Sequence, residues 1–339
     1  MRPCFHPRLL NGPFDDPGLF IPFLFENRAL LFDLGDLSCL SPKDILKTSH
    51  VFITHTHMDH FIGFDRLLRL LLGREKKVYL FGPRGFIKNV EGKLAGYSWN
   101  LAEKYNYRLQ LVLTEVRSDY TVTKSYHCRD KFVSREKAIK APFSGRLHDE
   151  AGFSISGVIL DHGLPCLGFS VHESFHINIV RAGLEELGLK TGPWLSRFKQ
   201  ELYSQSDPDS NFEVETADGK KAKRFALGEL KHRIARITPG QKITYITDVI
   251  YNDANRAKII EFAKNSDCLF IEAVFLHKDR EIARNKLHLT ARQAGELAAS
   301  SGAKQFTIFH FSPRYLGLEK LLYQEAAEAF ESLSYRFHS

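Results

Sequence analysis

The chain of 339 residues contains few cysteines, and their spacing limits the kinds of protein it can be. Five are present, they are widely separated, and no two form a Cys-x-x-Cys pair. This arrangement argues against a disulfide framework and against a structural zinc knuckle. It fits a protein that works in the reducing cytoplasm.

Long apolar stretches are also missing. The N-terminal residues lack the apolar core of a secretory signal peptide. No uninterrupted apolar run approaches the roughly 20 residues that span a bilayer. The sequence shows neither an internal repeat nor a low-complexity segment. We therefore expect a cytoplasmic protein without a membrane segment.

The composition is that of an ordinary folded protein. Hydrophobic residues make up 43% and charged residues 26%, a balance that argues against extensive disorder. The formal net charge of +7 weakly favours an anionic partner, such as nucleic acid or a phosphate ester. The length allows one large domain or two.

Apolar and polar patterning predicts many short strands in the first half of the chain and a strand–helix alternation after Pro239-Gly240. An Asp-Gly pair within residues 217–220 is typical of a tight hairpin turn. These features suggest two stacked sheets with helices outside. The expected elements are a hairpin within 19–34, strands at 76–82, 107–116, 120–124, 152–160, 166–172, 242–247, 268–274 and 305–309, and helices at 255–264, 290–301 and 318–330.

The densest chemical feature is the run Thr54-His55-Thr56-His57-Met58-Asp59-His60. It follows an apolar strand at 49–53 and precedes a helix expected over 61–72. Alternation along an extended segment points His55 and His57 the same way, while Asp59 and His60 belong to the turn that opens the helix. Imidazole and carboxylate groups converging from one short turn predict a site for a zinc-like divalent ion.

Three further donors each follow an apolar strand. They are His162, Asp248 and His310, and each alone is as readily a surface histidine or a helix cap as a ligand. Taken together they are more informative, because strand ends in an α/β sheet open onto one crevice. Seven donors exceed one tetrahedral site and suit two adjacent ions, with a carboxylate able to bridge them.

These motifs, with His310-Phe311-Ser312-Pro313-Arg314-Tyr315, closely resemble the metallo-β-lactamase superfamily and, within it, the ribonuclease Z (tRNA 3′-endonuclease) branch. The resemblance covers nearly the whole chain. It implies an α/β fold, the four-layer αβ/βα sandwich, in a single domain over 1–339. An insertion would lie at about 117–150 and a variable segment at about 183–235.

The resemblance also implies two zinc ions, with manganese or iron as other options, and a homodimer. One ion would be held by His55, His57 and His162. The other would be held by Asp59, His60 and His310, with Asp248 bridging the two. Asp33 would support the histidine loop by hydrogen bonding or would be an ordinary turn residue.

Four residues would carry the chemistry of phosphodiester hydrolysis. Asp59 would orient or deprotonate the attacking water, and Arg314 would neutralise charge on the phosphoryl oxygens. By resemblance, Glu272 and His288 form a pair that gives a proton to the leaving oxygen. The reaction would use a hydroxide activated by the two metal ions.

The chain departs from the ribonuclease Z pattern in its RNA-contacting segments. Residues 11–18 are acidic and lack the Pro-x-Lys-x-Arg-Asn loop, and no Gly-Pro-rich arm is recognisable between His162 and Asp248. Basic clusters occur instead at 220–224 and 231–233. Another lies within the insertion, at Arg129, Lys131, Arg135, Lys137 and Lys140. Such clusters are either solvated surface or phosphate contacts.

Four functions are therefore considered. The leading one is a zinc-dependent phosphodiesterase or endoribonuclease that cleaves tRNA 3′ trailers or related RNA. The alternative is a metal-dependent hydrolase of a small phosphodiester or cyclic nucleotide. A thioester or lactam hydrolase of the same fold comes third. A non-catalytic, metal-stabilised binding module is the fourth, and it would leave Glu272 and His288 without a purpose.

Overall fold

The structure is a computed structural model that describes residues 5–24, 26–215 and 222–337. Its internal contacts divide the chain into two compact units. The larger unit contains residues 5–147, 156–170 and the chain from 242 onward, and the smaller contains 148–155 and 171–241. The single-domain description of 1–339 stays a prediction.

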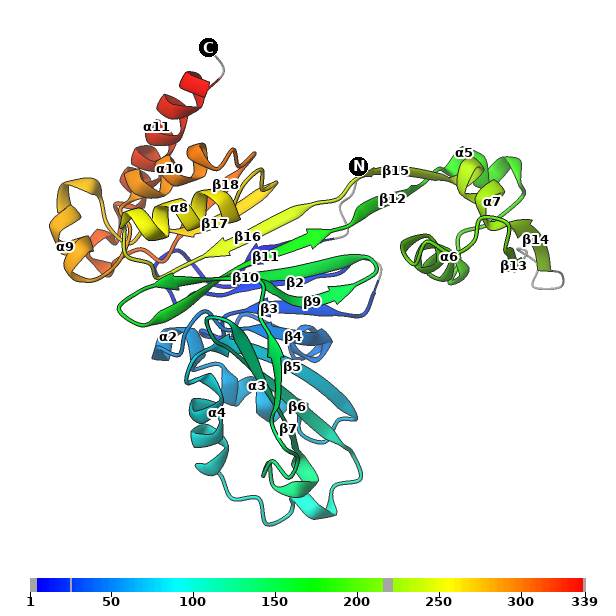
Figure 1. Ribbon diagram of the computed structural model, residues 1–339, viewed down its shortest axis with the longest axis horizontal. Coiled ribbons are helices and arrows are strands. Elements are labelled where there is room, and N and C mark those ends of the chain that lie inside the picture. The colour runs from blue at the N-terminus through cyan, green and yellow to red at the C-terminus, as the bar shows by residue number, and fades with distance from the viewer. Residues whose placement is uncertain (1–4, 25, 216–221, 338–339) are drawn as a thin grey trace. The chain divides into compact units, whose positions relative to one another are not determined.

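The first sheet of the larger unit has eight strands in the order of the sequence (Figure 1). Strands β3 to β6 run parallel, whereas β1–β3 and β6–β8 are antiparallel. The strands are β1 (Arg8–Leu9), β2 (Leu19–Pro22), β3 (Ala29–Phe32), β4 (Thr48–Phe52), β5 (Lys76–Pro83), β6 (Leu109–Val116), β7 (Tyr120–His127) and β8 (Ile139–Pro142).

The second sheet has six strands in the order β18-β17-β16-β11-β10-β9, and β16, β17 and β18 are parallel. Its strands are β9 (Arg146–Glu150), β10 (Phe153–Asp161), β11 (Pro165–Glu173), β16 (Lys242–Ile246), β17 (Cys268–Glu272) and β18 (Phe306–Phe309). The division between the two units falls within β9, β10 and β11.

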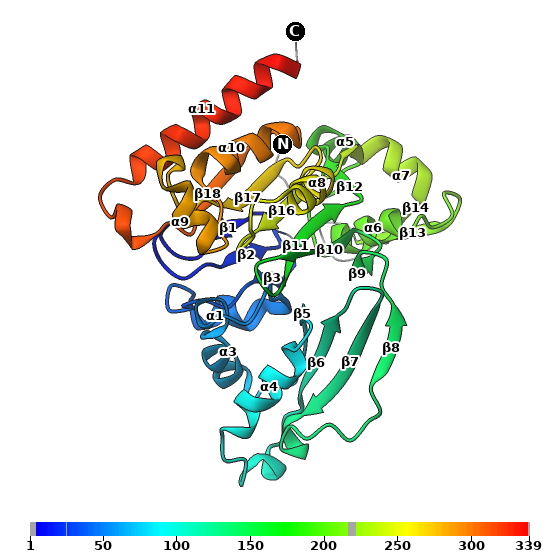
Figure 2. The ribbon, with the colours of Figure 1, turned by 60° about the vertical axis from the view of Figure 1, so that its left-hand side comes forward.

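Helices cover the outer face of each sheet, which gives the predicted four-layer αβ/βα sandwich (Figure 2). The first sheet is joined by α1 (Pro42–Lys47), α2 (Met58–Phe61), α3 (Phe64–Leu71), α4 (Phe86–Ala95) and the 3-10 turns η1 (Ala102–Lys104) and η2 (Cys128–Asp130). The second is joined by α8 (Asp253–Phe262), η3 (His277–Asp279), α9 (Arg280–Asn285), α10 (Ala291–Ser300), η4 (Pro313–Tyr315) and α11 (Glu319–Phe337).

An aromatic layer fills the space between the two sheets. The ring of Phe52 lies 5.5 Å from that of Phe169 on the opposite sheet, and Phe32 lies 5.7 Å from the same ring. Their neighbours along the strands, Leu31 and Val51, point the other way into the core under the helices. Because both faces are buried, these parallel strands read as continuous apolar runs rather than as alternating ones.

The hairpin expected within 19–34 is confirmed as β2 and β3, with Leu19 opposite Phe32. The single helix expected over 61–72 is wrong in part, because the chain forms α2 and α3 with a break at Gly63. A Cβ at Gly63 would lie 2.3 Å from the carbonyl oxygen of Gly35. This close approach requires glycine and ends the first helix.

The smaller unit has its own core, which includes Trp194, Phe198 and Leu230. An antiparallel ribbon of β12 and β15 leads to a hairpin and three helices. The elements are β12 (Phe175–Ile179), α5 (Arg181–Glu186), α6 (Trp194–Tyr203), β13 (Asn211–Glu215), β14 (Ala222–Ala226), α7 (Leu227–Ile234) and β15 (Ala235–Pro239). The turn predicted at 217–220 and the lysines at 220 and 221 lie outside the described residues.

Among the described residues, no helix is both long and apolar enough to cross a membrane.

Candidate metal centre

All seven predicted metal donors lie in the larger unit, on four segments that each follow a strand. The segment after β4 supplies four of them, two from the loop and two, Asp59 and His60, from α2, and the loops after β10, β16 and β18 supply one each. The structure gathers them into two groups that share one edge of the sandwich: His55, His57 and His162 with Asp248, and Asp59 and His60 with His310. Their role as metal ligands stays a prediction.

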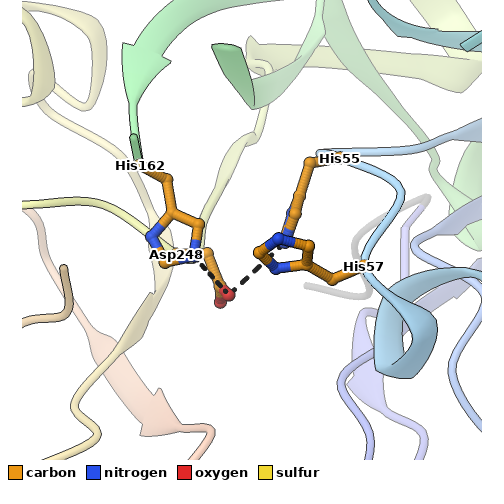
Figure 3. Close-up of side chains that lie close together, drawn as sticks. All are labelled: His55, His57, His162 and Asp248. Atoms are coloured by element: carbon orange, nitrogen blue, oxygen red, sulfur yellow. Dashed lines mark ion pairs between the residues drawn. The ribbon is translucent and has the colours of Figure 1, made fainter. Parts of the chain in front are cut away.

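The first group surrounds one oxygen of Asp248 (Figure 3). The Oδ2 atom of Asp248 is 3.5 Å from Nε2 of His55 and 3.4 Å from Nε2 of His162. Ligand atoms about 2.1 Å from a tetrahedral ion lie roughly 3.4 Å from one another. The spacing of these side chains therefore suits one divalent ion.

The second group faces the other oxygen of Asp248. Its Oδ1 atom is 3.4 Å from Nε2 of His60 and 3.0 Å from Nδ1 of His310. Asp59 closes this group, since its Oδ2 lies 3.4 Å from Nε2 of His60 and 3.3 Å from Nε2 of His310. The two oxygens of one buried carboxylate thus point into two separate sets of donors.

Several ring nitrogens in this centre are buried without a hydrogen-bond partner, namely Nε2 of His55, Nε2 of His60 and Nδ1 of His310. The opposite nitrogen of His60 donates to Asp33, and that of His162 bonds the carbonyl of Leu287, both at 2.9 Å. A buried polar atom without a partner is destabilising unless something binds it. These residues therefore fit a divalent metal and could hold one.

Asp33 connects the histidine loop to both sheets. Its carboxylate accepts hydrogen bonds from Thr54 N at 2.7 Å, from His60 Nδ1 at 2.9 Å and from the Tyr245 hydroxyl at 3.1 Å. The hydrogen-bonding role that the resemblance implied for Asp33 is confirmed. Tyr245 was not predicted from the sequence, because its position within the β16 strand indicates only a buried aromatic.

Three residues of this centre adopt left-handed backbone conformations within two residues of the end of a strand. They are Asp33 (φ 56°), Asp248 (φ 51°) and His310 (φ 64°). Non-glycine residues rarely adopt this region, and such strain is concentrated at functional sites. The conformation turns each side chain out of its strand towards the shared edge.

Three donors are in the protonation states that metal binding needs. Burial lowers the pKa of His55 to about 2, so its ring is neutral. Burial alone would raise the pKa of Asp248, but His310 and His60 outweigh it and hold that pKa well below its usual range. Burial acts on Asp59 in the same way, and the hydrogen bond from His310 together with the nearby charge of His60 leaves its pKa lowered. At His60 and His310 burial lowers the pKa, but the charge of Asp248 outweighs it and the pKa is raised, so these two rings would release a proton when a metal binds.

The predicted proton-transfer pair lies beside these donors. Glu272 is fully buried and accepts a 2.9 Å hydrogen bond from His288 Nδ1, while its other oxygen accepts from Val249 N at 2.7 Å. The His288 ring is 4.9 Å from that of His162. Burial lowers the pKa of His288, but the charge of Glu272 outweighs it, so the pKa is raised.

Arg314 is the predicted catalytic residue that the structure does not gather with the others. Its ion pair is with Asp279, at 3.5 Å, and its side chain is about half exposed. No hydrogen bond or ion pair among the described residues joins it to a metal donor. Its catalytic role stays a prediction.

Comparison with known proteins is consistent with this centre. Residues 212–311 match a family described as "Beta-lactamase superfamily domain". The chain is 29% identical to the ribonuclease Z of Deinococcus radiodurans over 84% of this chain and 83% of that protein. It is 26% identical to the ribonuclease Z of Nanoarchaeum equitans over 88% and 79%. The fold is shared with the metallo-β-lactamase fold protein YhfI of Bacillus subtilis, with a TM-score of 0.53 at 15% identity over 96% and 94%.

We expect replacement of Asp33 by asparagine to weaken metal binding by about 10- to 100-fold, because the loss of a partner that orients a histidine ligand has effects of this size. The amide cannot accept the bonds from both Thr54 and His60 with the same strength. Zinc titration against a competing chelator measures the change. Tyr245→Phe removes one donor to Asp33 and should have the smaller effect. An unchanged affinity in Asp33→Asn would contradict this role.

Proposed function

We propose that the chain is a metal-dependent hydrolase of the ribonuclease Z-like branch of the metallo-β-lactamase superfamily, and that it cleaves tRNA 3′ trailers or a related RNA. One observation carries the proposal. The two oxygens of Asp248 face two separate groups of donors, and the Glu272–His288 pair lies beside them. This arrangement suits hydrolysis of a phosphodiester that needs both charge neutralisation and a proton for the leaving group.

We propose zinc as the metal, since imidazole and carboxylate ligands suit it, with manganese and iron as the other candidates. His55, His57 and His162 would hold one ion, Asp59, His60 and His310 the other, and Asp248 would bridge them. The ions supply Lewis acidity, which makes a water nucleophile available near neutral pH and neutralises charge on the phosphoryl group.

The protein's own residues perform the remaining steps. Asp59, ionised at neutral pH, accepts a hydrogen bond from the attacking water and so orients it. Protonated His288 gives its Nε2 proton to the departing ribose oxygen, while Glu272 holds the Nδ1 proton and stabilises the cation. Arg314, fixed by Asp279, provides positive charge for the substrate phosphate.

The RNA substrate is supported by the relatives, which are ribonuclease Z proteins. The basic side chains of the smaller unit support it only in part. Arg224 is paired with Glu213 at 2.7 Å and Arg233 with Glu186 at 3.8 Å, as expected of solvated surface. Lys231 is exposed on α7 and is the clearest candidate phosphate contact there.

The purified protein, loaded with zinc, should be offered precursor tRNA and bis(p-nitrophenyl) phosphate. We expect one defined cut in the RNA and turnover of the small ester, both lost with a chelator and restored by zinc. Turnover of the ester without a cut in the RNA would favour the alternative, a hydrolase of a small phosphodiester or cyclic nucleotide. Turnover of neither would overturn the hydrolase.

The Glu272–His288 hydrogen bond predicts a pH dependence. His288 must be protonated to act as the acid, so this contribution is present below its pKa and is lost as the pH rises through it. Glu272 raises that pKa. In Glu272→Gln the basic limb of the rate profile should therefore move to lower pH. The profile of kcat for RNA cleavage measures it, and an unmoved limb would contradict the assignment.

We further propose a cytoplasmic, homodimeric enzyme. The cytoplasmic location is supported by the thiols of the described residues Cys39, Cys128 and Cys166, none of which forms a disulfide. The homodimer is supported only by resemblance to the ribonuclease Z branch, and the mass of the particle in solution tests it.

A further inference from the structure

A pocket of about 400 Å³, formed mainly by residues with polar or charged side chains, lies in the larger unit around the turn η2. Its volume is within the range of small-ligand sites. Its lining contains three guanidinium groups, one imidazole and one hydroxyl, together with two carboxylates and a thiol: Arg108, Arg129, Arg135, His127, Ser125, Asp130, Glu136 and Cys128. The proposed hydrolysis uses none of these residues.

Two of the arginines in this pocket lack an acidic partner. Arg135 is paired with Asp130 at 3.1 Å, which neutralises both charges. Within the described part of the chain, no ion pair involves Arg108 or Arg129. The remaining acid of the lining, Glu136, can offset only one of these two arginine charges. The lining as a whole therefore keeps a net positive charge. Unpaired guanidinium forks are the groups that bind phosphate most specifically.

Hydrogen bonds around the pocket fix the backbone segments that carry these residues. The amide of Arg108 donates to Glu75 Oε2 at 3.0 Å. Ser125 and His127 lie two residues apart on β7, so their side chains share a face. The buried thiol of Cys128 bonds the carbonyl of Tyr107, which anchors the turn that carries Arg129.

The two residues that follow the turn η2, Lys131 and Phe132, both have a φ of 55°. A left-handed conformation at a bulky residue such as Phe132 is strained. The Phe132 ring is buried and packs edge-on against Trp99 at 4.7 Å, which keeps this conformation in place. The turn η2, which forms one side of the pocket, is thus followed closely by a ring that is packed into the core.

The pocket lies at the opposite end of the first sheet from the metal centre. Phe52 of β4 is level with Phe81 of β5, and Phe81 with Thr114 of β6. His55 is three residues beyond that level and Arg108 is six residues before it. At 3.3 Å per residue, the two sites are roughly 30 Å apart along the strands.

We propose that this pocket is a binding site for a phosphate group, held by Arg108 and Arg129 with hydrogen bonds from Ser125 and His127. Arg135, fixed by Asp130, forms its rim. The phosphate belongs either to the backbone of the RNA or to a free phosphorylated compound. Phosphate binding in this pocket does not depend on the proposed function; only the assignment of RNA as the source of the phosphate rests on that function.

Calorimetric titration of the zinc-loaded protein with inorganic phosphate at low salt tests the pocket directly. Any phosphate that binds at the metal centre contributes equally to wild type and variants. In Arg108→Ala/Arg129→Ala, one equivalent of binding should be lost or weakened at least tenfold. Arg108→Lys/Arg129→Lys should bind with intermediate affinity, because lysine keeps the charge but not the fork. Unchanged binding in the alanine variant would overturn the proposal.

Arg256→Ala/Lys320→Ala is the matched control, since it removes two exposed cations from α8 and α11. It should keep the full phosphate stoichiometry, and an equal loss there would overturn the site. Turnover of bis(p-nitrophenyl) phosphate should be unchanged in all these variants, and that measurement separates the pocket from the hydrolase.

Precursor tRNA distinguishes the two sources of phosphate. If the ligand is the RNA backbone, the alanine variant should raise KM without changing kcat. It should also reduce the dependence of log KM on log salt by about 0.7–0.9, as one lost phosphate contact would. If phosphate binding is lost but KM is unchanged, the ligand is a free phosphorylated compound.

Discussion

Asp248→Ala is expected to lose at least one of two bound zinc ions per chain and to lower hydrolysis of every substrate by more than about 100-fold. That figure is the upper end of what loss of a mere supporting partner causes, and Asp248 touches both groups of donors. Without it, His60 and His310 also lose the acid that raises their pKa, so both become less basic. Elemental analysis of the dialysed protein and rates on both substrates measure the effect.

Asp253→Asn provides the control, because this residue is exposed at the first turn of α8, five positions away. It should keep two ions and full activity. Two tightly held ions in Asp248→Ala would show that the carboxylate does not bridge them, whatever the activity.

His288→Ala is expected to lower RNA cleavage by about 10²- to 10⁴-fold, the usual contribution of a general acid. It should lower turnover of bis(p-nitrophenyl) phosphate far less, because nitrophenolate is a stable anion that leaves without a proton. Metal content should be unchanged, since the Nδ1 atom of His288 bonds Glu272 rather than a donor of either group. Rates of RNA cleavage and of bis(p-nitrophenyl) phosphate turnover, measured in parallel for wild type and variant, give the ratio of the two losses.

His232→Ala, at an exposed histidine of α7, is the matched control and should change neither rate. Loss of metal from His288→Ala would show that His288 is a metal ligand or a structural residue. An equal fall on both substrates would contradict its role as the acid.

The arrangement of the metal centre is largely visible in the sequence because one pattern repeats. His55, His162, Asp248 and His310 each come just after an apolar strand, and strand ends in stacked α/β sheets meet at an edge. The structure gathers all of them there. The pattern is local, so periodicity and short motifs are enough to reveal it.

Other parts could not be predicted because they depend on long-range contacts. The hydrogen bond from Tyr245 to Asp33 joins residues 212 positions apart, and no spacing indicates it. The ion pair of Arg314 with Asp279, 35 positions earlier in the chain, is likewise not indicated by any motif. The separate core around Trp194 and Phe198 is built from amphipathic helices without a recognisable motif.

Anomalous diffraction at the zinc absorption edge, from crystals of the zinc-loaded protein, tests the central claim most directly. It should show two peaks, one on each side of Asp248. The first would be in contact with His55, His57 and His162, and the second with Asp59, His60 and His310. A single peak, or peaks that leave either oxygen of Asp248 unbound, would contradict a two-metal centre.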